Sequence, residues 1–294
     1  MAQKDLIIGA YTKYKFNLLK PWIHSIKQSG FTGDVVLIAI DADEETVKQI
    51  ENEGVIVVRA KNEQKMMIHM LRFLYIYNHL KDNTSYRYVI TTDVRDVIFQ
   101  SDPSLYLQKV FGSRDKGIVA QSEAIKIKDE TWNRENIIKN FGPYFYDHVK
   151  ENSVYNVGVL AGTADYIKDL CFTLFQMSSN RPDWVADQAA YNMIINYMPW
   201  SGATIKLDLV DAWAINAHVT NKPDQLEEFG PYLLEPRPFM KDGVIVNSGG
   251  KPFVIVHQYD RVPEWMEYFM KKYQFSVTSD TDTGTSPKYF TYNS

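Results

Sequence analysis

The sequence has little of what several classes of protein require. It contains one cysteine, Cys171, in 294 residues, so an intrachain disulfide and a zinc site built from cysteines are both excluded. No apolar run approaches the roughly 18 residues of a membrane span, and the N-terminus lacks the basic and apolar segments of a signal peptide. We therefore expect a soluble protein of a reducing compartment, the cytoplasm.

Neither sign of charge dominates the chain. The 32 basic and 36 acidic residues leave a formal net charge of -4, and no Lys/Arg run occurs, which argues against a nucleic-acid binder. The Gly-x-x-x-x-Gly-Lys-Ser/Thr, Gly-x-Gly-x-x-Gly, Gly-x-Ser-x-Gly and His-Glu-x-x-His patterns are absent as well. The hydrophobic fraction of 45% is that of an ordinary globular protein.

Short apolar runs alternate with longer segments of helical period, which is typical of a β-α-β chain with a largely parallel sheet. We predict strands at residues 6–10, 34–40, 55–58, 88–92, 117–121, 155–160 and 253–257. We predict helices at residues 22–28 (entered through Pro21), from a cap at Asp41 or Asp43 to residue 54, and at residues 65–80, 164–177, 186–197 and 263–273.

The regularity of the predicted helices and strands differs between the two halves of the chain. Residues 1–275 form one predicted α/β domain, with a regular half to about residue 100 and a more irregular half over about 101–275. Within the second half, residues 221–243 carry four prolines and are expected to cross the surface without regular structure. Residues 276–294 form a predicted polar tail. Ligands of open α/β sheets bind beyond the carboxyl ends of strands, so the loops after Ala10, Thr92 and Leu160 are the first candidates for a site.

Two carboxylates, Asp93 and Asp96, follow the predicted strand at 88–92. Burying them is costly unless their charges are paired, and a divalent cation such as Mn²⁺ or Mg²⁺ would pair them. In the alternative, Arg95 pairs with one carboxylate while the other caps the turn.

An apolar strand that ends in this way resembles the nucleotide-sugar-dependent glycosyltransferases of the GT-A fold and their Asp-x-Asp motif, although Arg95 stands at the position of the second Asp. Further segments resemble, in the required order, those of the galactosyltransferase/glycogenin-like branch, family 8: Tyr155-Asn156-Val157-Gly158-Val159, Asp187-Gln188 with Tyr191-Asn192, and Val256-His257-Gln258-Tyr259 with Pro263 and Trp265. In place of the Gly-x-Lys that usually follows the metal-binding His in that family, only Arg261 offers a nearby cation.

The resemblance implies a GT-A (Rossmann-like) fold with a mixed, mostly parallel sheet flanked by helices. It implies a nucleotide-binding half at about 1–100 and an acceptor and sugar half at about 101–275. It also implies these site residues: metal ligands Asp93, Asp96 and His257; catalytic Asp187 and Gln188; sugar-binding Arg95, Asn156 and Gly158; nucleotide-binding Tyr11, Thr12, Arg72, Asp93 and Arg261.

Each assignment has a plainer alternative. His257 could be a hydrogen-bonded structural residue, and Asp187 could cap the helix at 186–197. Asn156 could be a turn residue, and Gly158 could serve close packing. The loop at residues 10–15, where Tyr11 would stack on uracil, could be a surface turn. Arg72 could be solvated, or it could bind a carboxylate or a diphosphate.

The resemblance thus implies a Mn²⁺- or Mg²⁺-dependent transfer of a monosaccharide from a nucleotide diphosphate sugar, a UDP-sugar and in one version UDP-xylose, to a carbohydrate hydroxyl. The alternatives are a phosphatase of the haloacid dehalogenase type and a non-catalytic sugar-binding relative. Family 8 favours retention, while Asp187 and Glu123 keep inversion open. More loosely, the chain resembles the small glycosyltransferases of large algal viruses, which would place it in a host cytoplasm.

Overall fold

The computed structural model describes residues 3–112, 117–183 and 185–276. The strands are β1 (Lys4–Thr12), β2 (Asp34–Ile40), β3 (Ile56–Ala60), β4 (Tyr86–Thr92), β5 (Val97–Phe99), β6 (Ile118–Lys126), β7 (Ser153–Tyr155), β8 (Val159–Thr163), β9 (Thr204–Leu207), β10 (Ala214–Asn216), β11 (Phe239–Lys241), β12 (Val244–Val246) and β13 (Ile255–His257).

The helices are α1 (Phe16–Gln28), α2 (Glu44–Asn52), α3 (Ile68–Asp82), α4 (Pro103–Phe111), α5 (Thr131–Phe141), α6 (Pro143–Val149), α7 (Ala164–Ser178), α8 (Asp187–Asn196), α9 (Trp200–Ala203), α10 (Ala217–Asn221), α11 (Pro223–Phe229) and α12 (Pro263–Tyr273). Short 3₁₀ helices are η1 (Ile127–Asp129), η2 (Leu209–Asp211), η3 (Gly230–Tyr232) and η4 (Tyr259–Arg261). Among the described helices, none has both the length and the apolar character to cross a membrane.

The main sheet has the strand order β3-β2-β1-β4-β8-β6-β7, and β9 pairs with β6. β3, β2, β1 and β4 are parallel neighbours, whereas β8 is antiparallel to both β4 and β6. The predicted mixed, mostly parallel α/β sheet is therefore confirmed.

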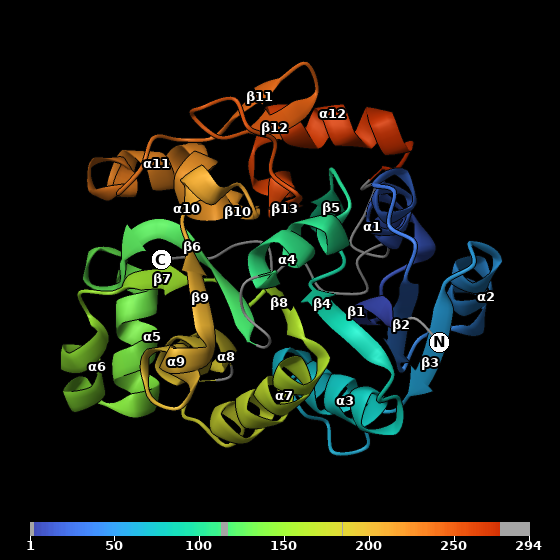
Figure 1. Ribbon diagram of the computed structural model, residues 1–294, viewed down its shortest axis with the longest axis horizontal. Coiled ribbons are helices and arrows are strands. Elements are labelled where there is room, and N and C mark those ends of the chain that lie inside the picture. Colours follow the sequence, from blue (N-terminus) through green and yellow to red (C-terminus); the bar gives the residue numbers. More distant parts are fainter. Residues whose placement is uncertain (1–2, 113–116, 184, 277–294) are drawn as a thin grey trace.

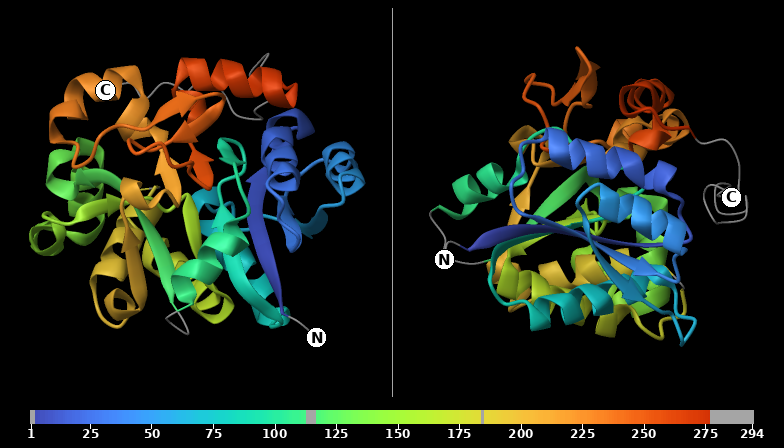
Figure 2. Two further views of the ribbon diagram at one scale, coloured as in Figure 1. Left: turned by 45° about the horizontal axis from the view of Figure 1, so that its top comes forward. Right: turned by 90° about the vertical axis from the view of Figure 1, so that its right-hand side faces the viewer.

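Helices cover both faces of this sheet, because side chains alternate in direction along each strand. In β1, Ile7 packs into one cluster with α1, α2 and α4, while Leu6 and Ile8 pack into another with α3, α7 and α8. Figure 1 shows α3 and α7 side by side, and the right-hand view of Figure 2 shows β1 between α1 and α3.

A small second sheet, β10-β13-β5, brings a late segment of the chain to the end of β4. β13 is antiparallel to β5, with His257 opposite Val97, the residue after Asp96. Gln258 N also donates to the Asp96 carbonyl at 2.7 Å. This register places His257 beside the acidic segment although more than 150 residues of sequence separate them.

Helix α1 does not begin at Pro21 as predicted. It begins at Phe16 and holds Pro21 in its interior. Leu18 and Leu19 lie before the proline on the same buried surface as Trp22 and Ile23. Burial of this longer stripe offsets the backbone hydrogen bond that proline cannot donate.

The predicted strand at 155–160 is also wrong, because the chain leaves β7 at Tyr155 and enters β8 only at Val159. Residues 221–243 are more regular than predicted. Pro223 and Pro231 occupy first turns, where the missing N–H costs nothing, so they start α11 and η3. Of the predicted tail at 276–294, only Ser276 lies within the described residues.

Candidate functional site

The site lies at the carboxyl ends of the parallel strands of the main sheet, and the strand directions explain why. The parallel strands β1 to β4 all end here, the antiparallel β8 begins here, and β6, which is antiparallel to β8, ends here as well. The residues that follow β4 and precede β8 are therefore neighbours. Asp93 N donates to the Gly158 carbonyl at 2.9 Å.

Asp93, Asp96 and His257 converge, with one ligand atom from each lying within 4.8 Å of the others. His257 Nε2 is 3.3 Å from Asp93 Oδ2 and 3.8 Å from Asp96 Oδ1. The Asp96 and His257 side chains are buried, while Asp93 is about one-third exposed, at 32%. Of the predicted metal ligands, all three meet, and the open side at Asp93 is where a substrate could approach.

The protonation of His257 suits a metal. Its Nδ1 pairs with Asn216 Oδ1 at 2.7 Å, so Nδ1 carries the proton and Nε2 presents a lone pair. Burial lowers the pKa of His257, which keeps the imidazole neutral near pH 7. Nε2 is buried and has no hydrogen-bond partner among the described residues, which is the state a metal bond would satisfy.

Gly158 makes room for this group. A Cβ atom at residue 158 would lie 2.3 Å from His257 Cε1 and 2.9 Å from Asp93 Oδ2. Neither distance is compatible with packed atoms, so any larger residue would displace the ligands. Two carboxylates, one imidazole and the space beside a glycine together fit a divalent cation.

Positive charge surrounds Asp96. Arg95 lies 3.5 Å from Asp96 Oδ2 and 3.3 Å from Asp260 Oδ2, and Arg261 bonds the same Asp260 oxygen at 2.8 Å. Burial opposes ionisation of Asp96, but charge from His257 when protonated, Arg95 and Arg261 lowers its pKa to about 2. The pairing of Arg95 with one carboxylate is therefore real, and it coexists with the convergence of the metal ligands.

Arg72 joins the two acidic parts of the site. It lies on α3, with one Nη bonded to Asp93 and the other 3.1 Å from Asp187 Oδ2. Of the roles predicted for Arg72, a carboxylate partner is confirmed. Asp187 is the first residue of α8 and is buried, and its Oδ1 accepts from Gln188 N at 3.0 Å. Asp187 thus forms an ion pair at the site, whereas the N-cap of α8 is Ala186 without a side-chain capping bond, so the alternative that Asp187 is the N-cap is wrong.

The segment that was expected to form a nucleotide-binding loop after residue 10 is partly strand in the structure. Strand β1 continues through Thr12, and Tyr11 is 1% exposed, so its ring offers no open face to a base in this structure. Base stacking on Tyr11 stays a prediction, and it requires the ring to leave the core. Thr12 is half-buried and lies beside Ile40 of β2.

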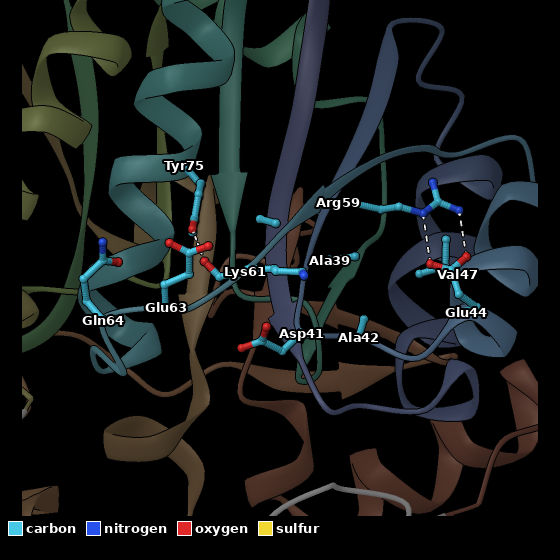
Figure 3. Close-up of a pocket in the computed structure, with 11 residues that line it drawn as sticks. Ala39, Asp41, Ala42, Glu44, Val47, Arg59, Lys61, Glu63, Gln64 and Tyr75 are labelled. Carbon is cyan, nitrogen blue, oxygen red and sulfur yellow. Dashed lines mark hydrogen bonds and ion pairs between the residues drawn. The ribbon is translucent and has the colours of Figure 1, made fainter.

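A polar cavity of about 550 Å³ opens at the carboxyl ends of β2 and β3, and Thr12 is not among the residues that line it. Figure 3 shows its lining: Asp41, Glu44, Arg59, Lys61, Glu63, Gln64 and Tyr75, with Ala39, Ala42 and Val47. Arg59 is held by Glu44 at 3.1 Å, and Tyr75 donates its hydroxyl to the Lys61 carbonyl.

Sequence reasoning missed Asn216, and no local pattern would have found it, because its contact with His257 depends on the pairing of β10 with β13. We expect Asn216→Ala to weaken binding of Mn²⁺ by about 10- to 100-fold, as loss of a residue that orients a metal ligand does. Calorimetric titration with Mn²⁺ measures this. Asn221→Ala, another buried asparagine whose amide bonds the Pro238 carbonyl, is the control, and equal affinities in the two variants would contradict the assignment.

No protein-family model and no curated protein matches the sequence. Solved structures do match. Mouse xyloside xylosyltransferase 1 in its apo form is 11% identical, with a TM-score of 0.53 over 86% of this chain and 97% of that one. The galactosyltransferase LgtC in complex with donor and acceptor sugar analogs is 11% identical, with a TM-score of 0.50 over 94% and 98%. An active-site mutant of LgtC is 10% identical, with a TM-score of 0.52 over 95% and 99%.

These neighbours are GT-A glycosyltransferases, and the chain has their fold. The GT-A fold predicted from the motif order is confirmed. At 10–11% identity the likeness shows the fold alone.

Proposed function

We propose that the protein is a metal-dependent glycosyltransferase that moves a monosaccharide from a UDP-sugar to a carbohydrate hydroxyl. The observation that carries this proposal is the convergence of Asp93, Asp96 and His257 beside Gly158, at the strand edge where α/β sheets bind ligands. A bound Mn²⁺ or Mg²⁺ would neutralise the charge that develops on the leaving diphosphate. UDP-xylose is the donor we would test first, since one structural neighbour is a xylosyltransferase.

The residues on either side of this group suit the two ends of such a donor. The end of β2 is separated from the end of β4 by one strand, and so by about 10 Å. The polar cavity at β2 and β3 is therefore within reach of the nucleoside of a diphosphate held at Asp93, and β1, which ends at Thr12, is the strand between them. Arg261 and Arg72 supply cations for the diphosphate.

The sugar would lie on the other side of Asp93, toward residues 101–275. Asn156, Gly158, Asp187 and Gln188 are close to one another there, and Arg72 connects Asp187 to Asp93. Arg95 contacts both Asp96 and Asp260. We propose that Asp187 and Gln188 grip the sugar near its reacting carbon.

In the reaction, the acceptor hydroxyl oxygen forms a bond to the anomeric carbon while the bond from that carbon to the diphosphate oxygen breaks. The bonding electrons leave with the diphosphate, and the hydroxyl proton passes to a base or to the leaving diphosphate. The two carboxylates that could serve as an acceptor-side base, Asp187 and Glu123, are buried and hydrogen-bonded. Their engagement favours a retaining reaction without such a base.

The test is turnover of UDP-sugars, measured as release of UDP, with Mn²⁺ and with a chelator. We expect at least one UDP-sugar to react only with the metal present and the product to keep the anomeric configuration of the donor. Release of phosphate from a phosphomonoester would indicate the phosphatase alternative. Saturable binding of a UDP-sugar without turnover would indicate a non-catalytic relative.

A further inference from the structure

A buried carboxylate, Glu123, accepts hydrogen bonds from two side-chain amides in the part of the site proposed to bind the sugar. Glu123 lies on β6 and is 4% exposed. Its Oε1 accepts from Asn156 Nδ2 at 2.5 Å and from Gln188 Nε2 at 3.2 Å. Two residues predicted to touch the donor sugar are therefore held by one oxygen that the mechanism above does not use.

These bonds fix the direction of both amides, because each points its nitrogen at Glu123 and its oxygen away. Asn156 Oδ1 then accepts from Gly158 N at 2.7 Å, and Gln188 Oε1 accepts from Val157 N at 3.2 Å. The side-chain amides of Asn156 and Gln188 thus connect the turn between β7 and β8 to the Glu123 carboxylate. Gly158 in this turn packs against His257 and Asp93, so the orientation set at Glu123 extends to the metal ligands.

A second buried carboxylate completes the network. Gln188 Nε2 also donates to Asn133 Oδ1 at 3.2 Å, and Asn133 Nδ2 donates to Glu130 at 2.6 Å. Glu130 additionally accepts the backbone N–H groups of Trp132 and Asn133 at the start of α5. The side-chain nitrogen of Gln188 donates to two partners and its side-chain oxygen accepts from a third, which prevents the amide from turning.

We propose that Glu123 is a positioning residue for the transfer reaction, and that its negative charge holds Asn156 and Gln188 in the orientation that receives the donor sugar. This inference rests on the proposed function and adds to it a pH control. Hydrogen bonds to a carboxylate are about twice as strong as those to a neutral acceptor, so protonation loosens both amides together.

The local charges set the pH at which this happens. Burial and nearby Glu130 raise the pKa of Glu123 to about 7, while hydrogen bonds from Asn156 and Gln188 oppose the rise, as a charge on His257 would if it were protonated. The carboxyl is ionised above this pH and protonated below it. Activity should therefore fall as the pH drops through about 7.

The same shift acts on stability with the opposite sign. A carboxyl whose pKa is higher in the folded state stabilises the fold most below its ordinary pKa of 4.5, and that contribution is lost as the pH rises through about 7. A neutral replacement should therefore remove a destabilising charge at pH 8.

The experiment compares Glu123→Gln and Glu123→Asp with wild type from pH 5 to 9, by turnover and by thermal unfolding. Glu123→Gln keeps the shape and loses the charge. We expect its kcat to fall by about 10- to 100-fold at pH 8, its pH profile to lose the step near 7, and its melting temperature at pH 8 to exceed that of wild type. Glu123→Asp keeps the charge and should retain a pH step. The control is Glu151→Gln, an exposed glutamate that pairs with Lys126 and Lys128.

Three outcomes would overturn the proposal: wild-type kcat in Glu123→Gln, an unchanged pH step in that variant, or a loss of stability that accompanies the loss of activity at pH 8. The last result would show a structural role only. If Glu123→Gln does not fold, the absence of a pH step in Glu123→Asp is sufficient to reject the proposal. The unfolding measurement needs no substrate. A protein that turns over no UDP-sugar but shows the pH-dependent stability difference would therefore contradict the proposed function and not the ionisation of Glu123.

Discussion

Replacing Asp96 or His257 by alanine is expected to abolish Mn²⁺-dependent turnover while the protein remains folded. Each side chain supplies one of three converging ligand atoms, and each is nearly fully buried. Loss of a residue that merely orients a ligand costs about 10- to 100-fold in metal affinity, so loss of a ligand should cost more than about 100-fold. Turnover of the UDP-sugar and calorimetric titration with Mn²⁺ measure the two effects.

The matched control is Asp34→Ala. Asp34 begins β2 at the opposite edge of the sheet and pairs with Lys4 at 2.9 Å. The Asp34→Ala variant should bind Mn²⁺ with the affinity of wild type. Full Mn²⁺-dependent activity in the Asp96 or His257 variant, or activity of wild type that survives chelation, would contradict the metal assignment.

Asp187→Asn is expected to lower kcat by about 100-fold, the size of effect seen when one oriented polar group at a reacting centre is lost. Asparagine retains an oxygen that can accept from Gln188 N, so the first turn of α8 keeps this hydrogen bond. What is lost is the charge opposite Arg72, which links Asp187 to Asp93. Steady-state kinetics measure the effect on turnover, and circular dichroism checks that the variant is folded.

Asp102→Asn is the control for the same substitution at the start of another helix. Asp102 is the N-cap of α4, and its Oδ1 accepts from Ser104 N at 2.8 Å. That variant should turn over like wild type. If Asp187→Asn also turns over at the wild-type rate, the charge of Asp187 has no part in turnover and other residues must hold the sugar.

The elements with a strong local signal could be predicted from the sequence. The helix at 263–273 has its predicted bounds, because Pro263 fixes its start and an apolar stripe of Trp265, Phe269 and Tyr273 fixes its face. The strand before Asp93 was predicted for the same kind of reason, since an apolar run meets acidic residues. Local propensity and tertiary packing agree in these segments.

Other elements depend on contacts that are distant in sequence. Residues 156–158 form a turn because the side-chain oxygens of Asn156 and Gln188 take the N–H groups of Gly158 and Val157, which a strand would have used. The sequence shows only an apolar run there. Pro21 likewise looks like a helix start until the burial of Leu18 and Leu19 is known.

The candidate site shows the same division. Motif order predicted that Asp93, Asp96 and His257 would meet, and they do. The sequence could not show that Asn216 sets the His257 tautomer, since this depends on the register of β10 and β13. Nor could it show that Tyr11 is buried, because β1 extends two residues beyond the predicted strand.

The central claim is that one divalent cation and the diphosphate of a nucleotide meet at Asp93, Asp96 and His257. The most direct test is a crystal of the protein soaked with UDP and Mn²⁺, with anomalous diffraction to locate the manganese. We predict one manganese peak bonded to Asp93 Oδ2, Asp96 Oδ1 and His257 Nε2, with both phosphates of UDP beside it. Manganese bound elsewhere, or UDP bound away from an intact and metal-free Asp93, Asp96 and His257, would contradict the account.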